Sequence, residues 1–267
     1  MSEVPLPHEV PARTPDVAAP ATDAAAHNPE VPGALNFRDV GGLPASGGGA
    51  TRAGVLFRSG NLARVGDAGR RALRGLGVRS IVDLREDDEI AFEPTDIGDL
   101  PVSVQRVPLF AGSLASFFEA DITLAGLYRS LIDASGEAIV DVVRRIVSDA
   151  PVLVHCTVGK DRTGVVVALT LAAAGVEEDA IVADYARTET LLPPERNARV
   201  LAYLQRSHPD ARNLADLATR SPAPVMRSLL AELRTQYGAP VEFLRAQGLR
   251  DDEVAELRRV LIRPDRT

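Results

Sequence analysis

The chain contains a single cysteine and a single lysine, and they stand four residues apart, at Cys156 and Lys160. Arg162 completes a Cys-x5-Arg segment. The apolar run 151–154 before it predicts a buried strand, and the run 165–174 after it predicts a helix. A loop between a strand and a helix N-terminus collects backbone N–H groups and the positive end of the helix dipole. The segment therefore favours an anion site built around a cysteine thiolate.

The chemistry that suits such a loop is phosphoryl transfer. We expect Cys156 to be the nucleophile, because a helix N-terminus stabilises a thiolate. The planar fork of Arg162 can hold two phosphoryl oxygens. His155 is expected to support the loop by hydrogen bonding, and the Thr163 hydroxyl to bond the sulfur. The predicted phosphate-binding residues are Thr157, Val158, Gly159, Lys160, Asp161, Arg162 and Thr163.

Other interpretations of the segment fit less well. A lone cysteine is most often a small buried hydrophobe. A dinucleotide-binding turn would need a G-x-G-x-x-G pattern, which is absent here. A rhodanese-type loop also places one cysteine after a strand, but sulfur transfer does not need the frame His155-Cys156…Arg162-Thr163-Gly164. The segment thus predicts a cysteine-dependent phosphatase with no metal and no other cofactor.

The same loop resembles that of a family of bacterial protein tyrosine phosphatases typified by a secreted mycobacterial enzyme. The resemblance spans about residues 33–262. It is carried, besides the loop, by segments 35–40, 56–59, 67–70, 82–85, 181–185, 237–238 and 243–245. It implies a cysteine-phosphatase-like fold and hydrolysis of phosphotyrosine. Several such enzymes also accept phosphoserine, phosphothreonine or phosphoinositides, and the pair Lys160-Asp161 goes with that broad specificity.

The leaving oxygen needs a proton donor, usually a carboxylic acid. The chain has no tryptophan, so the tryptophan-bearing acid loop of the animal tyrosine phosphatases is absent. Asp83, at the end of the predicted strand 80–84, is expected at the carboxyl edge of the sheet, where open α/β sheets place their sites. Asp161 lies in the loop itself. Both remain candidates; the alternatives are an ion pair with Arg85 for Asp83 and a solvated, cavity-shaping carboxylate for Asp161.

Three further charged residues precede the loop in the chain. Arg38 and Asp39 stand just before a Gly-Gly turn, and we expect them to tie the N-terminal segment to the core. Arg58 follows an apolar run, and it is either structural or directed toward the substrate.

Composition limits the partners and the compartment. The chain has 267 residues, 45% of them hydrophobic, and a net charge of −7. A broad nucleic-acid interface is therefore not expected, and no apolar run is long enough to predict an integral membrane segment. One cysteine excludes an intramolecular disulfide framework. Because no basic and apolar leader opens the sequence, the cytoplasm is the expected compartment, with signal-less secretion as the alternative.

One folded domain is expected after an N-terminal tail. Residues 1–32 hold seven of the 19 prolines and little apolar periodicity, which predicts a mobile tail, and residues 33–265 form the phosphatase domain. Strands are expected at 54–58, 80–84, 102–107 and 151–154, and helices at 67–76, 87–92, 114–133, 137–148 and 165–174. The alternation predicts an α/β fold with a central, mostly parallel sheet flanked by helices.

The second half is predicted to be almost wholly helical. Helices are expected at 178–190, 194–206, 210–219, 224–236, 240–247 and 251–261. Apolar residues along the pair 194–206 and 210–219 are typical of core helices. The resemblance instead implies a mobile two-helix lid over the loop, at residues 194–220, which would exclude water and gate access.

The sequence thus predicts a protein tyrosine phosphatase with a phosphocysteine intermediate and with activity toward phosphoserine or phosphothreonine as an open question. The alternative is a phosphoinositide phosphatase that uses the same loop. Lys160 favours the alternative, because a basic pocket suits inositol phosphates, and the acidic charge of the chain opposes it. A catalytically inactive phosphate-binding module is disfavoured, because Cys156, Arg162 and Thr163 are all present.

Overall fold

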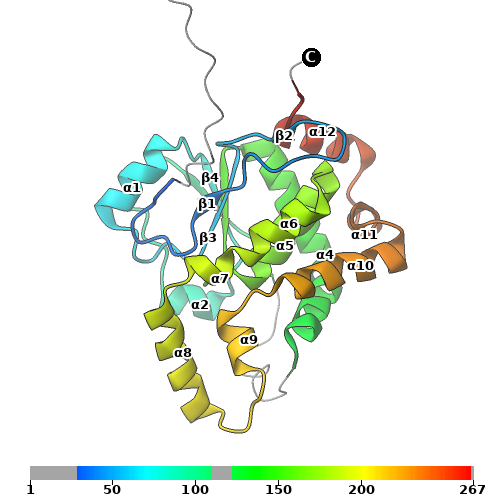
Figure 1. Ribbon diagram of the computed structural model, residues 1–267. Coiled ribbons are helices and arrows are strands. Elements are labelled where there is room, and N and C mark those ends of the chain that lie inside the picture. The colour runs from blue at the N-terminus through cyan, green and yellow to red at the C-terminus, as the bar shows by residue number, and fades with distance from the viewer. Residues whose placement is uncertain (1–28, 110–121, 266–267) are drawn as a thin grey trace, which may run out of the picture.

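The computed structural model describes residues 29–109 and 122–265 (Figure 1). A five-stranded sheet lies at its centre, in the order β1-β3-β6-β4-β5. Its strands are β1 (Arg38–Asp39), β3 (Leu56–Ser59), β4 (Ser80–Asp83), β5 (Ser103–Arg106) and β6 (Val152–His155). Only β1 runs antiparallel to its neighbour within this sheet. The predicted α/β fold with a mostly parallel sheet is confirmed.

Helices cover both faces of the sheet, and they make up most of the second half of the chain, as predicted (Figure 1). The helices are α1 (Gly66–Gly75), α2 (Asp87–Phe92), α4 (Leu124–Asp149), α5 (Asp161–Ala174), α6 (Glu178–Ala186), α7 (Thr188–Leu191), α8 (Pro194–Ser207), α9 (Leu214–Thr219), α10 (Ala223–Tyr237), α11 (Pro240–Ala246) and α12 (Asp251–Leu261). A second, two-stranded sheet pairs β2 (Ala50–Thr51) with β7 (Ile262–Arg263), and so joins an early segment to the end of the domain.

The central strand β6 is buried on both faces. Val152 and Val154 pack in the larger hydrophobic cluster, with α4 and α5. Leu153 points the other way, into a smaller cluster with Leu73 of α1. Because successive strand residues face opposite sides, a strand covered on both faces is apolar at every position. This explains why the run before Cys156 is continuously hydrophobic rather than alternating.

The predicted break between helices 114–133 and 137–148 is confirmed as a kink within α4. This element runs from Leu124 to Asp149 as two helical segments that meet at Ser135, whose φ of −126° and ψ of 18° are not helical. Both halves bury apolar side chains in the same cluster, for example Leu131 and Ile139. The two segments therefore follow one another along the same core despite the kink, because packing of an apolar face contributes more to helix stability than intrinsic propensity does. Residues 110–121 lie outside the described part.

The start of the folded part differs slightly from the expected boundary. Residues 1–28 of the predicted tail lie outside the described residues. Val31, however, is only 5% exposed and belongs to the smaller cluster. Residues 29–32 therefore contribute to the folded core. Among the described residues, no helix has the length and hydrophobicity that crossing a membrane requires.

Candidate active site

The loop from Cys156 to Arg162 connects β6 to α5, as the sequence predicts. Cys156 is 3% exposed, and its Sγ accepts a hydrogen bond from the backbone N–H of Gly159 at 3.3 Å. Gly159 has a φ of +71°, and a Cβ there would lie 2.3 Å from the backbone carbon of Ser59. Only glycine fits this position, because it combines a left-handed conformation with close approach of a second backbone. The turn brings an amide onto the sulfur.

Residues distant in the sequence donate hydrogen bonds to a carbonyl group in the middle of the loop. The carbonyl oxygen of Gly159 accepts hydrogen bonds from Asn36 Nδ2 at 2.9 Å and from Arg58 Nη2 at 3.0 Å. Asn36 itself has a φ of +56°, a conformation that asparagine tolerates better than most residues. With their carbonyls engaged behind the loop, the peptide units can present their N–H groups to the opposite side.

Asp184 of α6 anchors this support. Its carboxylate accepts from Arg38 Nε at 2.7 Å and from Arg58 Nη1 at 2.6 Å, and all three side chains are at most 2% exposed. Burial alone would raise the pKa of Asp184, but the charges and hydrogen bonds of Arg58 and Arg38 keep it below its ordinary value. Arg38 thus ties the N-terminal segment to α6, and Arg58 holds the loop rather than facing open solvent. Asp39 instead accepts backbone N–H bonds from Gly41 and Gly54.

Arg162 is held by a residue that sequence reasoning missed, Glu89 of α2. Arg162 Nη1 donates to Glu89 Oε2 at 2.5 Å, and Nη2 donates to Oε1 at 2.5 Å. Glu89 Oε1 also accepts from the Thr157 hydroxyl, and Oε2 accepts the backbone N–H of Glu86. Burial raises the pKa of Glu89, but the bonds and charge of Arg162 outweigh it and leave the pKa lowered. Glu89 is therefore a carboxylate at neutral pH.

This pairing leaves part of the arginine fork for a substrate. Glu89 takes the edge formed by Nη1 and Nη2. On the other edge, formed by Nε and Nη2, Nη2 also donates to Thr157 Oγ1 at 3.2 Å, so a substrate oxygen bound there would share Nη2 with Thr157. A guanidinium can bind one oxyanion along each of these edges. The Arg162 guanidinium stays positively charged. Burial lowers its pKa, but the hydrogen bond to Glu89 and the charges of Cys156 and Glu89 raise it by more than burial lowers it.

Asp83 lies at the carboxyl end of β4 but is fully engaged there. Arg85 donates to its Oδ1 from Nε at 2.9 Å and to its Oδ2 from Nη2 at 2.7 Å, and Asp83 is 2% exposed. Burial raises its pKa, but Arg85 and the nearby His155 leave it lowered. His155 Nε2 lies 3.6 Å from the Asp83 carboxylate, and its Nδ1 lies 3.2 Å from the Cys156 carbonyl oxygen. Burial lowers the pKa of His155, which favours the neutral ring.

Asp161 occupies a different environment, at the first turn of α5. Its side chain is 24% exposed, and its Oδ1 accepts from Lys160 Nζ at 2.6 Å and from Tyr128 Oη at 2.9 Å. Lys160 is only 1% exposed. The charge of Lys160 is therefore neutralised by the adjacent Asp161 in the loop.

Comparison with known proteins agrees with this geometry. The sequence profile of the tyrosine phosphatase family matches residues 29–263. The chain belongs to the tyrosine phosphatase family. It is 32% identical to the triple specificity protein phosphatase PtpB of Mycobacterium tuberculosis over 277 aligned residues, which cover 87% of this chain and 98% of that protein. It is also 32% identical to a tyrosine-protein phosphatase of Nostoc commune, over 80% of this chain and 76% of that protein. The predicted family membership is confirmed.

The remaining loop residues of this tyrosine phosphatase family member also have defined contacts. The carbonyl oxygen of Thr157 accepts from Asn61 Nδ2 at 3.2 Å, and that of Val158 accepts from Asn36 Nδ2 at 3.2 Å. Thr163 differs from expectation: within the described ranges its buried hydroxyl has no hydrogen-bond partner, so it makes no bond to the sulfur here.

One signal in the sequence points toward Glu89. Glu86 and Glu89 form a capping box at the start of α2, immediately after β4, and an acidic helix start at the carboxyl edge of a sheet lies near any site there. Asp87 and Asp88 share this position, however, and spacing alone does not select Glu89. Asn36 lies in segment 35–40, which carries the family resemblance but gives it no role, and Tyr128 carries no local motif that would have marked it.

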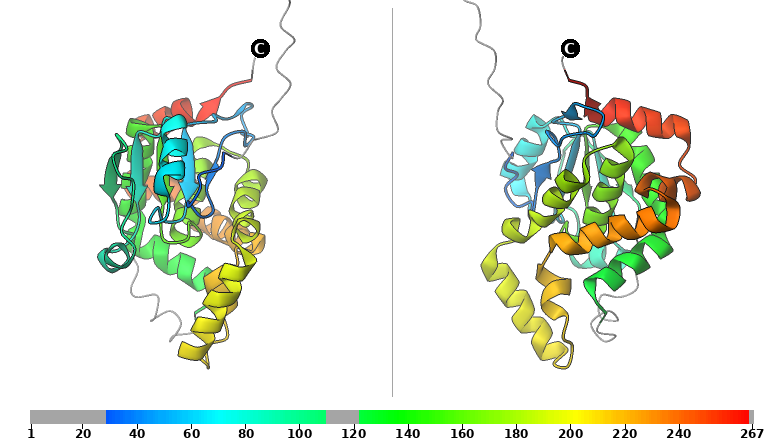
Figure 2. Two further views of the ribbon diagram at one scale, coloured as in Figure 1. Left: turned by 90° about the vertical axis from the view of Figure 1, so that its left-hand side faces the viewer. Right: turned by 45° about the vertical axis from the view of Figure 1, so that its right-hand side comes forward.

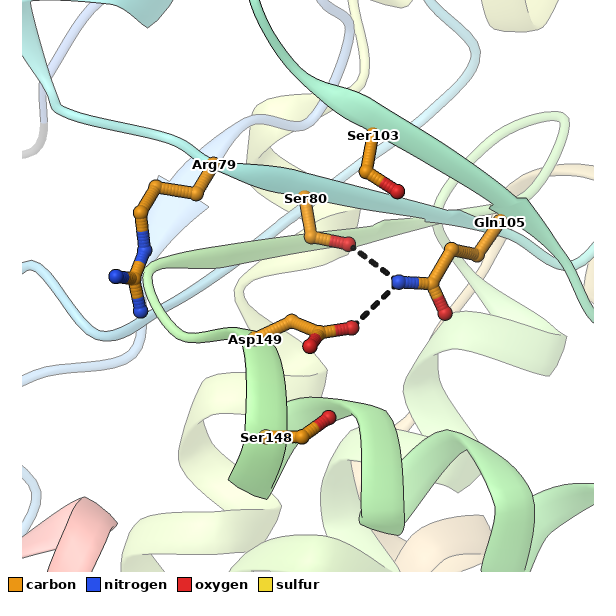
Figure 3. A pocket seen from close by; sticks show the side chains of 6 residues that line it. All are labelled: Arg79, Ser80, Ser103, Gln105, Ser148 and Asp149. Carbon is orange, nitrogen blue, oxygen red and sulfur yellow. Dashed lines mark hydrogen bonds between the residues drawn. The ribbon is translucent and has the colours of Figure 1, made fainter.

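A hollow in the surface lies away from this site (Figure 3). It opens at the amino ends of β4 and β5, beside Ser80 and Ser103, whereas the loop follows the carboxyl end of β6. Gln105 Nε2 donates to Ser80 Oγ at 3.2 Å and also to Asp149. Three of the six lining side chains, Gln105, Ser80 and Asp149, thus bond to one another, and Asp149 adds a carboxylate to the hollow.

Proposed function

We propose that the chain hydrolyses phosphotyrosine through a phosphocysteine intermediate, with Cys156 as nucleophile. The single observation that carries the proposal is the Cys156 sulfur in contact with the Gly159 N–H, in the β6–α5 loop that also holds Arg162. The thiolate attacks phosphorus, the S–P bond forms and the bond to the tyrosyl oxygen breaks. Water then attacks phosphorus, and the S–P bond breaks to release phosphate. Arg162 and the loop amides stabilise the charge on the transferring group.

We assign the proton transfers to Asp161. It gives its proton to the leaving oxygen in the first step and takes one from water in the second. Two observations support Asp161 over Asp83. The Asp83 carboxylate is buried and held on both oxygens by Arg85, which lowers its pKa and keeps it charged. Asp161 is part-exposed at the loop, and its Oδ2 has no hydrogen bond within the described ranges.

The contacts of Lys160 support phosphotyrosine over a phosphoinositide as the main substrate. A pocket for a multiply phosphorylated inositol ring needs uncompensated positive charge. Lys160 is buried and paired with Asp161 at 2.6 Å, and Glu89 adds a further negative charge beside the loop. The feature that favoured a lipid substrate is therefore neutralised within the site.

We also propose that α8 and α9, within residues 194–220, form a lid. The two helices pack against each other and project from the body beyond α2 (Figure 2). Leu204, Leu214 and Leu217 are buried, whereas the rest of α8 stays largely accessible. Because Leu217 also belongs to the main hydrophobic cluster, α9 attaches the pair to the body, and the accessible helix α8 is the part freer to move.

The test is kcat/KM on a phosphotyrosine peptide, its phosphoserine and phosphothreonine counterparts, and phosphoinositides in mixed micelles, with Cys156→Ser as the blank. We expect the phosphotyrosine peptide to be hydrolysed best, vanadate to inhibit, and Cys156→Ser to lose all turnover while keeping its circular dichroism spectrum. Full activity of Cys156→Ser would refute the mechanism. Faster hydrolysis of phosphoinositides would refute the substrate assignment but not the mechanism.

A further inference from the structure

Two buried tyrosines form a chain of hydroxyl groups that ends on Asp161. Tyr128 of α4 lies with its Oη 2.9 Å from Asp161 Oδ1. The Oη of Tyr185, from α6, lies 2.7 Å from that of Tyr128. Neither side chain is more than 1% exposed, and the rings meet edge to face with centroids 6.1 Å apart. Neither hydroxyl has a role in the mechanism described so far.

Counting donors and acceptors fixes the direction of each hydrogen bond in this chain of hydroxyl groups. An ionised carboxylate only accepts hydrogen bonds, so Tyr128 must donate its one proton to Asp161. The Tyr128 oxygen is then an acceptor toward Tyr185, and Tyr185 must be the donor of the 2.7 Å bond. Burial, followed by the charge of Asp161, raises the pKa of both tyrosines, so both keep their protons at neutral pH.

The hydrogen bonds to Asp161 also determine which of its two carboxylate oxygens can carry a proton. Oδ1 of Asp161 accepts from Tyr128 and from Lys160 Nζ, at 2.9 and 2.6 Å. A carboxylate oxygen offers about two lone pairs to donors. With both used on Oδ1, a proton taken up by Asp161 must sit on Oδ2. The two donors therefore restrict the side-chain rotamer and leave Oδ2 as the oxygen that can carry the proton.

Tyr185 is adjacent to the residue that anchors the middle of the loop. Asp184 binds Arg58, and Arg58 donates to the Gly159 carbonyl. Tyr185 acts at the other end of the loop, through Tyr128, and its ring also lies against the start of α5, where a Cβ on Gly164 would come within 3.1 Å of it. Two consecutive residues of α6 thus support both the nucleophile side and the acid side of the site.

We propose that Tyr128 is a positioning residue that holds Asp161 in the geometry for proton donation through Oδ2, and that Tyr185 in turn orients Tyr128. The inference rests on the proposed function, because it requires Asp161 to protonate the leaving group. It predicts that loss of either hydroxyl impairs only reactions that need that proton.

The experiment compares two substrates in the full-length protein. Phenyl phosphate releases a phenol with a pKa of about 10, as tyrosine does, and needs protonation. 4-Nitrophenyl phosphate releases a much weaker base and needs little. Asp161→Asn should lower kcat/KM for phenyl phosphate by about 100-fold or more. Tyr128→Phe should lower it by about tenfold through misplacement of the acid. For 4-nitrophenyl phosphate, kcat/KM of both variants should stay within about threefold of the wild type, because kcat/KM reports formation of the phosphocysteine and not its hydrolysis, in which Asp161 is the base.

Two controls separate positioning from general damage. Tyr237→Phe removes a hydroxyl on α10, where the ring packs on Phe243 away from the loop, and should match the wild type on both substrates. In an Asp161→Asn background, Tyr128→Phe should cause less than about a twofold further loss, because it acts through Asp161. If Tyr128→Phe does not fold, Tyr185→Phe takes its place, with an expected loss of about threefold on phenyl phosphate alone.

The possible results distinguish a failure of this inference from a failure of the proposed function. A wild type without phosphatase activity refutes the proposed function. An Asp161→Asn variant with equal losses on both substrates refutes the assignment of the acid. If Asp161→Asn shows the substrate dependence but Tyr128→Phe shows equal losses on both, or behaves as Tyr237→Phe does, the positioning role is overturned.

Discussion

Replacing Glu89 by glutamine tests whether this residue positions the catalytic arginine. The carboxylate accepts two bonds from Arg162, both at 2.5 Å. An amide keeps one acceptor oxygen and turns an NH₂ group toward a guanidinium that has only donors. One charge-assisted bond is lost and one donor–donor contact is created. Hydrogen bonds to charged groups contribute about 1.5–3 kcal/mol, so we expect a loss of about 2–3 kcal/mol in transition-state stabilisation.

Converted to a rate, this is a roughly 30- to 150-fold decrease in kcat/KM for Glu89→Gln. The assay is steady-state hydrolysis of a phosphotyrosine peptide, with the affinity for vanadate measured in parallel. Asp88→Asn is the matched control, because it removes one negative charge from an exposed position of the same helix. We expect it to stay within about twofold of the wild type.

The opposite result would have a clear meaning. If Glu89→Gln binds vanadate more tightly and keeps or gains kcat/KM, the carboxylate competes with the phosphoryl group for Arg162. Glu89 would then be an inhibitory contact that substrate displaces, and the argument from the two edges of the guanidinium would be refuted.

Two further predictions concern the support of the loop. Asp184→Asn leaves two buried arginines without their carboxylate and should lower the free energy of unfolding by about 3–5 kcal/mol in urea titrations. The control Asp179→Asn, which removes an exposed ion-pair partner, should lower it by less than about 1 kcal/mol. The pKa of Asp184 is lowered in the folded state, so this stabilisation is complete above the pKa of 3.8 in the unfolded chain and is lost as pH falls through the folded-state pKa. If wild type and Asp184→Asn still differ by the same free energy of unfolding at pH 2, this reasoning is contradicted. Gly159→Ala should abolish activity, because its Cβ meets the backbone of Ser59, whereas Gly175→Ala has a similar positive φ in open space and should lose stability alone. Equal activity of the two alanine variants would show that the close approach at Gly159 is not required.

Local features of the site were predictable from the sequence. The residues of the loop are contiguous, so their amides necessarily gather between a strand end and a helix start. The strand before the loop is recognisable, because burial on both faces requires an unbroken apolar run. The helical second half follows from its apolar periodicity in the same way.

Contacts between distant segments were not predictable. Glu89, Asp83 and Asp161 are all acids near the carboxyl edge of the sheet, and the sequence treats them alike. The ion pair of Asp83 with Arg85 was one alternative that the sequence offered, and Lys160 is the neighbour of Asp161 in the chain. The contacts of Glu89 with Arg162 and of Tyr128 with Asp161, however, join distant segments. The kink of α4 at Ser135, by contrast, was predictable, because it follows from a local break in the helical pattern.

The sequence alone predicts the nucleophile, the arginine and the glycine turn of this tyrosine phosphatase family member, because their chemistry depends on spacing along the chain. Only the tertiary structure shows that Glu89 pairs with Arg162, that Arg58 bonds the loop and that Tyr128 contacts Asp161. Those assignments depend on burial and on charges within hydrogen-bonding distance. Both arise when α2, α4 and α6 converge on one end of the sheet.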